Sequence, residues 1–555
     1  MLLLALGLRL HGVGFGLPAL NDPDEPLFVM TALDMLRDHS LDPGWFGHPA
    51  TTTLYCLATI FYLIGAIGIA TARFADAHAF VSAVYADPGI IFLPGRLFIV
   101  ACGVACVWLT YRIGTRIGDR RLGLLAAFFL AVNAVHIEYS QIIRTDVQAS
   151  VFMLMATLSA LAIARDGGRR DYLLAGVCVG LACATKWPAA AVLIGPFCAA
   201  LPWLRRDRAA LANIALLFAV SVATLLLVSP YLLLDYQTVL YDLAGEARPK
   251  HPGATGSGFL GNFVWYISHP LLRSLGWAGL ILVGPGLVAM TIRNARARVA
   301  IVPMCLTFLV LISVQSLVWE RWIVPLLPFA ALAMAYALRT AMLALVRAFG
   351  GRILAFEWAA AAMLAIPMLQ AAWTSAEERL HDTRQVASAW VRANVSPGSS
   401  ILVEHAAFDI FQGPWHLRFP IGTAGCVDVR QALGGHMRYS RVEKLRRGSP
   451  VVDIGYVDAS RLQTCRADYA VFSHYARYAE DSEAFAPQLA QYLALMRTGS
   501  TVMVIRPVAG RSSGPEIVIV KSHDHDNRGM QSRHQANPRR EDGMKALMPR
   551  NKTKA

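Results

Sequence analysis

Long apolar segments separated by short polar loops run through the first two thirds of the chain. They lie near residues 1–19, 52–72, 91–111, 122–140, 147–164, 172–204, 209–229, 274–292, 299–318, 322–346 and 353–373. Segments of about 18–22 apolar residues are long enough to cross a hydrocarbon core of roughly 30 Å as helices. The stretch 172–204 exceeds one crossing and contains Pro188 within "TKWP", so two helices are expected there. The pattern predicts a polytopic α-helical membrane protein.

Composition supports the same class. The chain is 55% hydrophobic, has a mean hydropathy of +0.45 and is only 16% charged, against roughly 25% in soluble proteins. Its net charge of +14 is better explained by topology signals and by contact with anionic lipid headgroups than by binding of nucleic acid. The first apolar segment lacks a small-residue cleavage site, so we expect no cleavable signal peptide. Arg9 is the one positively charged residue of this segment, so a start codon further upstream is an alternative.

Arginine-rich loops determine the expected topology, because such loops face the cytoplasm. Five loops of the chain are rich in arginine. If the N-terminus lies in the cytoplasm, all five of these loops face the cytoplasm only if the segment 52–72 does not cross the membrane. We therefore predict that 52–72 is a juxtamembrane or re-entrant helix in one long outer loop, Ala19 to about Ile90. This gives about eleven crossings with the C-terminus outside. The loops carry Arg112, Arg116, Arg120 and Arg121; Arg165, Arg169 and Arg170; Arg205, Arg206 and Arg208; Arg293, Arg296 and Arg298; and Arg347 and Arg352.

The composition changes beyond Ala372, where helix and strand patterns replace long apolar runs. "TRQVASAWVRANVSPGSSILVEHA" indicates an amphipathic helix, a Pro-Gly turn and a strand. Further strands are expected at "DYAVFSH", "TVMVIRP" and "EIVIVK", with a helix at 483–496. We predict a transmembrane domain at 1–373, a small α/β extracytoplasmic domain at 374–520, and a basic disordered tail at 521–555.

Nine cysteines are present, and seven of them lie in apolar segments as small core residues. Cys426 and Cys465 lie instead in the polar C-terminal part. In an oxidising compartment they form either a disulfide or two free buried thiols, because the sequence does not give their separation.

Charged residues gather where apolar segments end on the expected outer face. "NDPDEPLFVMTALDML" places Asp22, Asp24 and Glu25 directly after the first segment. These acids are candidates for a functional site. Acids also suit the first turn of a helix, so a purely structural role is the alternative to a functional one. Other charged or polar residues are candidates for the same functional site, and each has a structural alternative. Asp146 could pair with Arg144 or cap a helix. Arg96 and Lys186 could snorkel to the membrane interface, and His48 could belong to a turn. His136 and Glu138 lack a third metal ligand at helical spacing.

Seven stretches in order resemble the GT-C superfamily of polyprenyl-phosphate-sugar-dependent glycosyltransferases, glycosyltransferase family 39 type. They are "LRLHGVGFGLP", "DPDEPLFVMTALDML", "HPATTTLY", "LPGRLFIV", "HIEYSQIIRTDVQASVFML", "GLACATKWPA" and "ERWIVPLLPFA". The resemblance covers about residues 1–335 and is nearest to the protein O-mannosyltransferases and lipid A aminoarabinose transferases. Phe28 stands where many members have tyrosine, and "GHPA" where the aminoarabinose transferases have Lys-Pro.

The resemblance implies an enzyme of the bacterial inner membrane, with its site and C-terminal domain on the periplasmic side. It would transfer a sugar with inversion from a polyprenyl phosphate to an acceptor hydroxyl, or to a phosphate, of an envelope protein, lipid or glycan. From the residues themselves we expect no cofactor, no bound metal and no nucleic-acid partner. Asp24 is the expected base, and Glu25 and Asp146 are expected to position the acceptor or the Arg and Lys side chains. The expected phosphate partners are Arg96, Lys186, His48, Arg144 and Arg321. The alternatives are a transporter or flippase of lipid-linked sugars, or a non-catalytic envelope assembly protein.

Overall fold

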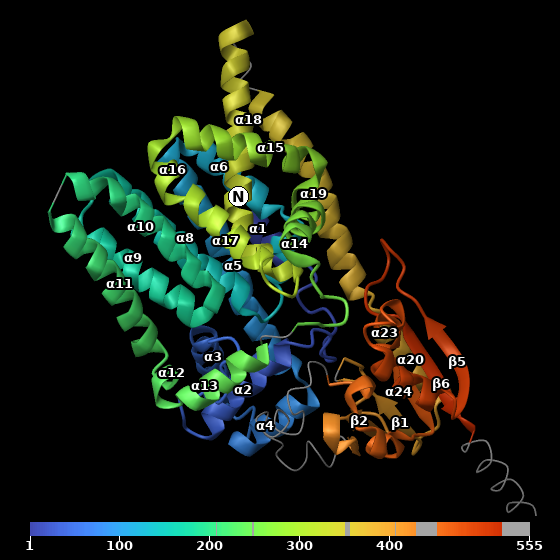
Figure 1. Ribbon diagram of the computed structural model, residues 1–555. Coiled ribbons are helices and arrows are strands. Elements are labelled where there is room, and N and C mark those ends of the chain that lie inside the picture. The colour runs from blue at the N-terminus through green and yellow to red at the C-terminus, as the bar shows by residue number, and fades with distance from the viewer. Residues whose placement is uncertain (207, 247–248, 350–355, 406, 429–451, 524–555) are drawn as a thin grey trace, which may run out of the picture.

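The computed structural model describes residues 1–206, 208–246, 249–349, 356–405, 407–428 and 452–523. It has two parts, a large helical bundle and a small sheet-containing domain at one end of it (Figure 1). Nine helices of the described chain are long and apolar enough to cross a membrane. They are α3 (Thr51–Ala70), α5 (Gly89–Ile117), α8 (Thr145–Asp166), η1–α10–η2 (Trp187–Arg205), α11 (Ala209–Val228), α14–η3–α15 (Gly258–Arg293), α16–α17 (Ala295–Ser313), η4–α18 (Glu320–Ala348) and α19–α20 (Glu357–Asn394).

Three expected crossings are shorter as helices than the sequence suggests. The first, α1, spans only Leu2–Leu10, because Gly12 and Gly16 take positive φ and the chain continues in turns. The segment 122–140 divides into α6 (Arg120–Ala131) and α7 (Ala134–Tyr139), with Asn133 capping α7. The helix α9 (Arg169–Thr185) has 17 residues. The polytopic class is confirmed, whereas the count of eleven crossings stays a prediction.

The break inside 172–204 is confirmed. Helix α9 ends at Thr185, Lys186 is extended, and a 3-10 helix η1 (Trp187–Leu193) carries Pro188 in its first turn. Proline lacks the N–H that a continuing helix needs, but tolerates a helix start. The break lies at the end of the bundle near the small domain, and it turns the chain beside the first residues of α8 and α3.

Helix α3 belongs to a group at that same end. Its buried residues Leu54, Leu57 and Phe61 share an apolar cluster with Phe28 of α2 (Glu25–Arg37) and Phe92 in the first turn of α5. Figure 1 shows α2, α3, α4 (Ala77–Ala86), α12 (Tyr231–Leu234) and α13 (Tyr236–Glu246) together there. Helix α3 is long enough to cross, so its placement at a membrane surface remains a prediction that this packing favours.

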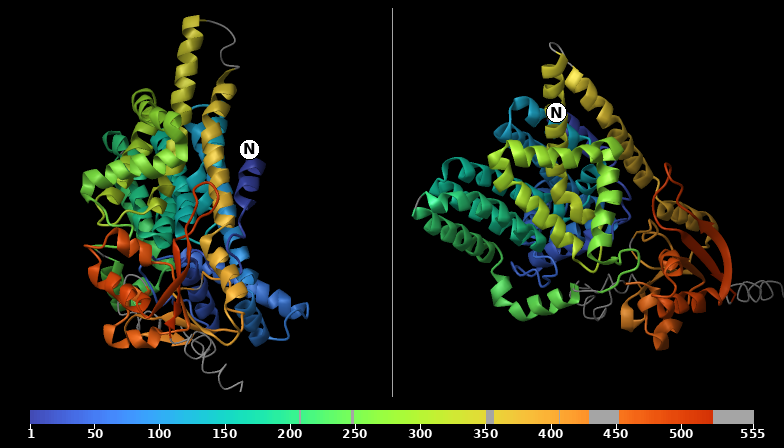
Figure 2. Two further views of the ribbon diagram at one scale, coloured as in Figure 1. Left: turned by 90° about the vertical axis from the view of Figure 1, so that its right-hand side faces the viewer. Right: turned by 45° about the horizontal axis from the view of Figure 1, so that its top comes forward.

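The arginine-rich loops gather at the opposite end, which we call the arginine end. Hydrogen bonds join the helix ends there: Asn294 donates to the Ile117 carbonyl at 2.5 Å, and Trp203 donates to the Ile163 carbonyl at 2.8 Å. Helix α5 connects both ends; Arg96 and Arg116 lie twenty residues apart on it, which is about 30 Å at 1.5 Å per residue. Figure 2 shows α18 and α19 projecting beyond the bundle at this end. Arg352 lies outside the described residues.

The small domain is built on a six-stranded sheet of order β3-β2-β1-β4-β6-β5. Strand β1 is parallel to β2 and β4, and the remaining pairs are antiparallel. The strands are β1 (Ser400–Val403), β2 (His416–Pro420), β3 (Cys426–Asp428), β4 (Tyr469–Phe472), β5 (Gly499–Ile505) and β6 (Ile517–Ser522), and its longer helices are α20 (Thr383–Asn394) and α24 (Ala486–Met496). The four expected strands and both helices are present. The expected tail begins too early at 521, because Lys521 and Ser522 belong to β6. Residues 524–555 of the tail lie outside the described chain.

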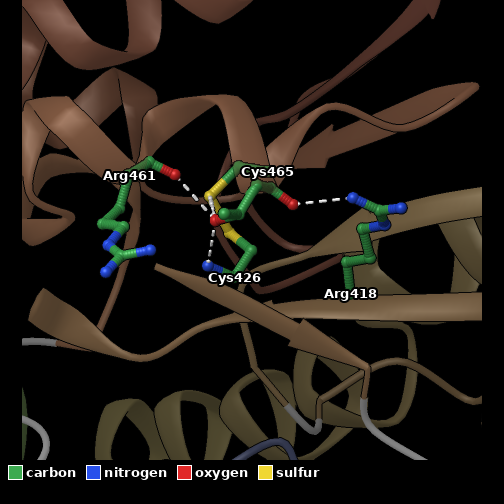
Figure 3. Close-up of a disulfide and its surroundings, with 5 residues drawn as sticks. Arg418, Cys426, Arg461 and Cys465 are labelled. Carbon is green, nitrogen blue, oxygen red and sulfur yellow. Dashed lines mark hydrogen bonds between the residues drawn. A yellow bond between two sulfur atoms is a disulfide. The ribbon is translucent and has the colours of Figure 1, made fainter. Parts of the chain in front are cut away.

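Cys426 and Cys465 are joined in a disulfide, with their Cα atoms 4.9 Å apart (Figure 3). The bond ties β3 to the 3-10 helix η8 (Ala459–Cys465). Nearby, the Cys426 N–H donates to the Thr464 hydroxyl at 2.7 Å, and Arg418 donates to the Thr464 carbonyl at 2.8 Å. Of the two states that the sequence leaves open, the structure has the disulfide.

Removing this bond should destabilise the small domain. We expect Cys426→Ala with Cys465→Ala to lower its opening free energy by roughly 3–4 kcal/mol, because the bond closes a long loop in the unfolded chain. Hydrogen exchange of the β4 and β6 amides in the full chain measures this. Cys178→Ala, at a buried free thiol of the bundle, is the control. Equal exchange in the double variant and the control would contradict the expectation.

Candidate active site

The acidic loop, residues 21–25, is organised by Asp22 at the start of α2. Asp22 Oδ1 accepts the backbone N–H groups of Asp24 (3.0 Å) and Glu25 (3.2 Å). These are N–H groups that a helix start leaves unpaired. Pro26 in the first turn needs no such acceptor. Both oxygens of Asp22 also accept from Arg144 Nη2 at 3.0 Å. Asp22 therefore connects the start of α2 to the residue that precedes α8.

Asp24 lies between two guanidinium groups. Arg144 Nη1 donates to Asp24 Oδ2, and Arg321 Nη2 lies 3.6 Å from the same oxygen. Burial opposes ionisation of Asp24, but the charges of Arg144 and Arg321 outweigh it and hold the pKa well below its ordinary value. Asp24 is therefore a carboxylate at neutral pH.

Asp24 is also the most accessible acid of the site. Its side chain is 37% exposed, whereas those of Asp22, Glu25 and Asp146 are 11%, 0% and 3% exposed. Both cation contacts of Asp24 fall on Oδ2. Within the described residues its Oδ1 has no hydrogen-bond or ion-pair partner. This oxygen can meet a substrate without displacing a protein group.

Glu25 and Arg96 form a closed ion pair beneath the loop. Arg96 Nε and Nη2 donate to the two Glu25 oxygens at 2.8 and 2.7 Å, and neither side chain is exposed. Arg96 Nη1 also donates to the carbonyls of Val13 (2.9 Å) and Phe15 (2.8 Å). The Ile143 N–H donates to Glu25 at 2.9 Å. The geometry gives Arg96 no snorkelling path, and a phosphate could reach it only by displacing Glu25.

Lys186 and Asp146 form a second closed pair. Lys186 Nζ donates to Asp146 Oδ1, and the two residues are 5% and 2% exposed. The extended backbone at Lys186, between α9 and η1, lets its side chain meet the first turn of α8. Asp146 thus pairs with Lys186, whereas the sequence suggested Arg144 as a structural partner.

His48 lies in the loop before α3, near Lys186 and Arg321. Burial and the positive charges of Lys186 and Arg321 lower its pKa to about 3. At neutral pH the imidazole is therefore uncharged. It can exchange hydrogen bonds with a phosphate, but it adds no positive charge.

A row of threonines fixes the start of α3 against the neighbouring helices. Their hydroxyl groups are buried and each bonds to a different element. The bonds join Thr51 to Ser229 (2.8 Å), Thr52 to Thr185 (2.6 Å) and Thr53 to Gln148 (2.6 Å). The motif "HPATTTLY" is thus a structural clamp beside His48, a role that its sequence did not reveal.

Arg321 is the least engaged cation of the site. It lies on the 3-10 helix η4 (Glu320–Leu326), and its guanidinium is 4.5 Å from the centre of the Trp319 ring. It makes no hydrogen bond within the described residues, and its side chain is 14% exposed. Arg144 Nε is likewise buried without a hydrogen-bond partner there. Arg321 therefore retains donors for an anionic ligand, whereas the free Nε of Arg144 is enclosed by protein.

A second ionic network lies beside the site and involves residues the sequence did not connect. Arg273 donates to Glu320 at 2.6 Å and also to Glu138, which accepts from Ser375 at 2.8 Å. His136 is fully buried and bonds to an arginine, Arg9, at 2.9 Å. Throughout the described residues no group of three or more His, Cys, Asp or Glu side chains is placed to hold a metal.

Comparison with known proteins adds a family match. The family model described as dolichyl-phosphate-mannose-protein mannosyltransferase matches residues 89–234, less than half of the chain. This segment contains Arg96, Arg144, Asp146 and Lys186. Comparison of the sequence with curated proteins gives no match.

Comparison with solved structures gives further similarities. ArnT from Cupriavidus metallidurans in the apo state has 16% identity and a TM-score of 0.52, over 90% of this chain and 94% of that chain. ArnT from the same organism bound to undecaprenyl phosphate has 14% identity and a TM-score of 0.49, over 93% and 97%. AglB from Archaeoglobus fulgidus, with an inhibitory peptide and a dolichol-phosphate, has 12% identity and a TM-score of 0.48, over 90% and 71%. The apo ArnT match shows the fold, and with the family match it confirms the resemblance to the GT-C superfamily.

Proposed function

We propose that the protein transfers a sugar, with inversion, from a polyprenyl-phosphate-linked donor to an acceptor hydroxyl. The family match and the fold support this reaction class. The observation that carries the proposal is Asp24: an ionised, accessible carboxylate that two arginines flank on one oxygen only. A weak hydroxyl nucleophile needs such a base in its transition state.

Each residue of the site has a separate role in the proposed reaction. Asp24 Oδ1 accepts the proton as the acceptor oxygen attacks C1 of the sugar. The bond between C1 and the donor phosphate breaks on the opposite side, and the leaving phosphate gains negative charge. Arg321 and Arg144 stabilise that charge, and neutral His48 can donate a hydrogen bond.

The closed ion pairs support inversion. A retaining double displacement needs a second carboxylate as nucleophile, about 5–5.5 Å from the acid. Glu25 and Asp146, the neighbouring acids, are bound by Arg96 and Lys186 and are nearly unexposed. We assign positioning roles to these four residues. Lys186 becomes a phosphate partner only by leaving Asp146.

We propose that the site and the small domain face the periplasm of a bacterial inner membrane. The argument is the separation of about 30 Å along α5 between the site and the arginine end, since arginine-rich loops stay in the cytoplasm. The acceptor would then be a hydroxyl of an envelope protein, lipid or glycan.

Cysteine labelling tests this orientation. In a variant that keeps the disulfide but lacks the seven free cysteines, Ala77→Cys should react with an impermeant reagent in intact cells. Arg116→Cys should react only after permeabilisation. Both positions are exposed on the protein. Labelling of position 116 from outside would reverse the proposed orientation.

Transfer itself is tested with purified protein in nanodiscs. A pool of labelled polyprenyl-phosphate sugars and cell-envelope acceptors should yield free polyprenyl phosphate and labelled product. The rival function is movement of intact donor across a bilayer. Proteoliposomes that translocate the donor without cleaving it would favour a flippase and refute the transfer reaction.

A further inference from the structure

Helix α20 of the small domain contacts the acidic loop through a reciprocal amide pair. Asn21 Nδ2 donates to Gln385 Oε1, and Gln385 Nε2 donates to Asn21 Oδ1, both at 2.9 Å. The neighbouring Arg384 Nη1 donates to the Asn21 carbonyl at 2.7 Å. Asn21 is 4% exposed. Three hydrogen bonds thus connect one loop residue of the bundle to two consecutive residues of the small domain.

Both sides of this contact are held in place. Asp382, which caps α20, accepts from Arg384 Nε at 2.7 Å and from Nη2 at 2.6 Å. On the bundle side, a Cβ at Gly16 would lie 2.6 Å from the Asn21 side chain, and Gly16 has a φ of +75°. The turn after α1 therefore packs directly against Asn21. The asparagine has little room for another rotamer.

The small domain is also fixed to the membrane helix that leads into it. The Ser513 N–H donates to the carbonyl of Glu378, near the end of α19, at 2.9 Å. The Thr383 N–H donates to the Ser513 carbonyl at 2.9 Å. The loop between β5 and β6 thus closes over the joint of α19 (Glu357–Leu380) and α20. These backbone bonds hold Arg384 and Gln385 in position against the bundle.

We infer that the Asn21–Gln385 amide pair positions the catalytic base, so that the small domain is part of the active site. Asn21 directly precedes Asp22. Asp22 accepts the Asp24 and Glu25 N–H groups and also accepts from Arg144, and Arg144 in turn donates to Asp24. Gln385 thus acts on Asp24 through a continuous series of bonds. It is a positioning residue for the proposed transfer reaction, and its assignment rests on that proposed function.

A matched pair of glutamines tests the inference. Gln385→Met keeps the side-chain volume and removes the amide. Gln412→Met is the control, because Gln412 also joins the small domain to the bundle, through the carbonyls of Tyr85 (3.2 Å) and Ala86 (3.4 Å), away from the acidic loop. Hydrogen exchange of residues 21–25 in the full chain in nanodiscs gives the first readout. We expect at least ~10-fold faster exchange in Gln385→Met, from the loss of two hydrogen bonds, and no change in Gln412→Met.

Turnover of the labelled donor pool gives the second readout. Gln385→Met should lower kcat by about 10-fold to 10²-fold with little change in KM, as expected for a misplaced catalytic group. Asn21→Ala should have a similar effect, and the double variant should be no worse than either single one. Equal exchange and equal kcat in the two glutamine variants would overturn the inference. If wild-type protein transfers no sugar, the proposed function fails, while the exchange readout still decides the structural coupling.

Discussion

Replacing Asp24 with asparagine is expected to lower sugar-transfer turnover by at least ~10²-fold, the range for a lost general base. Asparagine keeps the shape of the side chain and can still accept a hydrogen bond from Arg144. It cannot take the acceptor proton. Expression and donor binding should therefore stay nearly unchanged. Single-turnover measurements in nanodiscs, with donor binding measured separately, distinguish these effects.

The pH dependence gives an independent check on the base. Because Arg144 and Arg321 hold the pKa of Asp24 below its ordinary value, which is about 4, the base stays ionised throughout the neutral range. Wild-type turnover should then show no fall from Asp24 protonation between about pH 5 and 8. Arg321→Gln removes one stabilising charge, so the acidic limb should move to higher pH.

The other carboxylates serve as controls for this assignment. Glu25→Gln should cost less turnover than Asp24→Asn and more stability, because Glu25 is closed off by Arg96. Wild-type turnover in Asp24→Asn, together with an inactive Asp146→Asn, would place the base on Asp146 instead.

The site's residue types could be predicted from the sequence, but not their pairing. The apolar runs showed where helices end, and thus that Asp24, Arg144 and Lys186 lie at helix ends. Partners such as Glu25 with Arg96 are 71 residues apart, and no local pattern encodes them. The snorkelling alternative for Arg96 is wrong, because the side chain is fully buried.

Two features of this region have a local signal in the sequence. Acids at a helix start commonly accept its unpaired N–H groups, and this predicts the bonds from the Asp24 and Glu25 N–H groups to Asp22. The glycines between His11 and Pro18 indicate that α1 ends early. The short strands β2 and β3 gave no comparable signal. The Asn21–Gln385 pair joins residues 364 positions apart, and only the folded chain shows it.

Breaking the Glu25–Arg96 pair from one side should have the largest effect on stability. Arg96→Met leaves the Glu25 carboxylate fully buried without its cation. We expect a loss of about 3–5 kcal/mol in the free energy of unfolding, the usual cost of removing one partner of a buried pair. Glu25→Gln with Arg96→Met should recover part of that loss, since no uncompensated charge remains. Denaturant unfolding in a fixed detergent, followed by tryptophan fluorescence, measures both.

A surface ion pair on α2, the helix that carries Glu25, provides the control. Comparison with this pair distinguishes two roles for Arg96. Arg37 and Asp34 of α2 form an ion pair with side chains 39% and 20% exposed. Arg37→Met should change stability by less than about 1 kcal/mol. If Arg96→Met is as stable as Arg37→Met but binds the polyprenyl-phosphate donor weakly, Arg96 contacts the phosphate, as its motif suggested. Strong destabilisation of Arg96→Met, with donor affinity retained in the folded fraction, establishes Arg96 as the residue that holds Glu25 and the loops around it beneath the base.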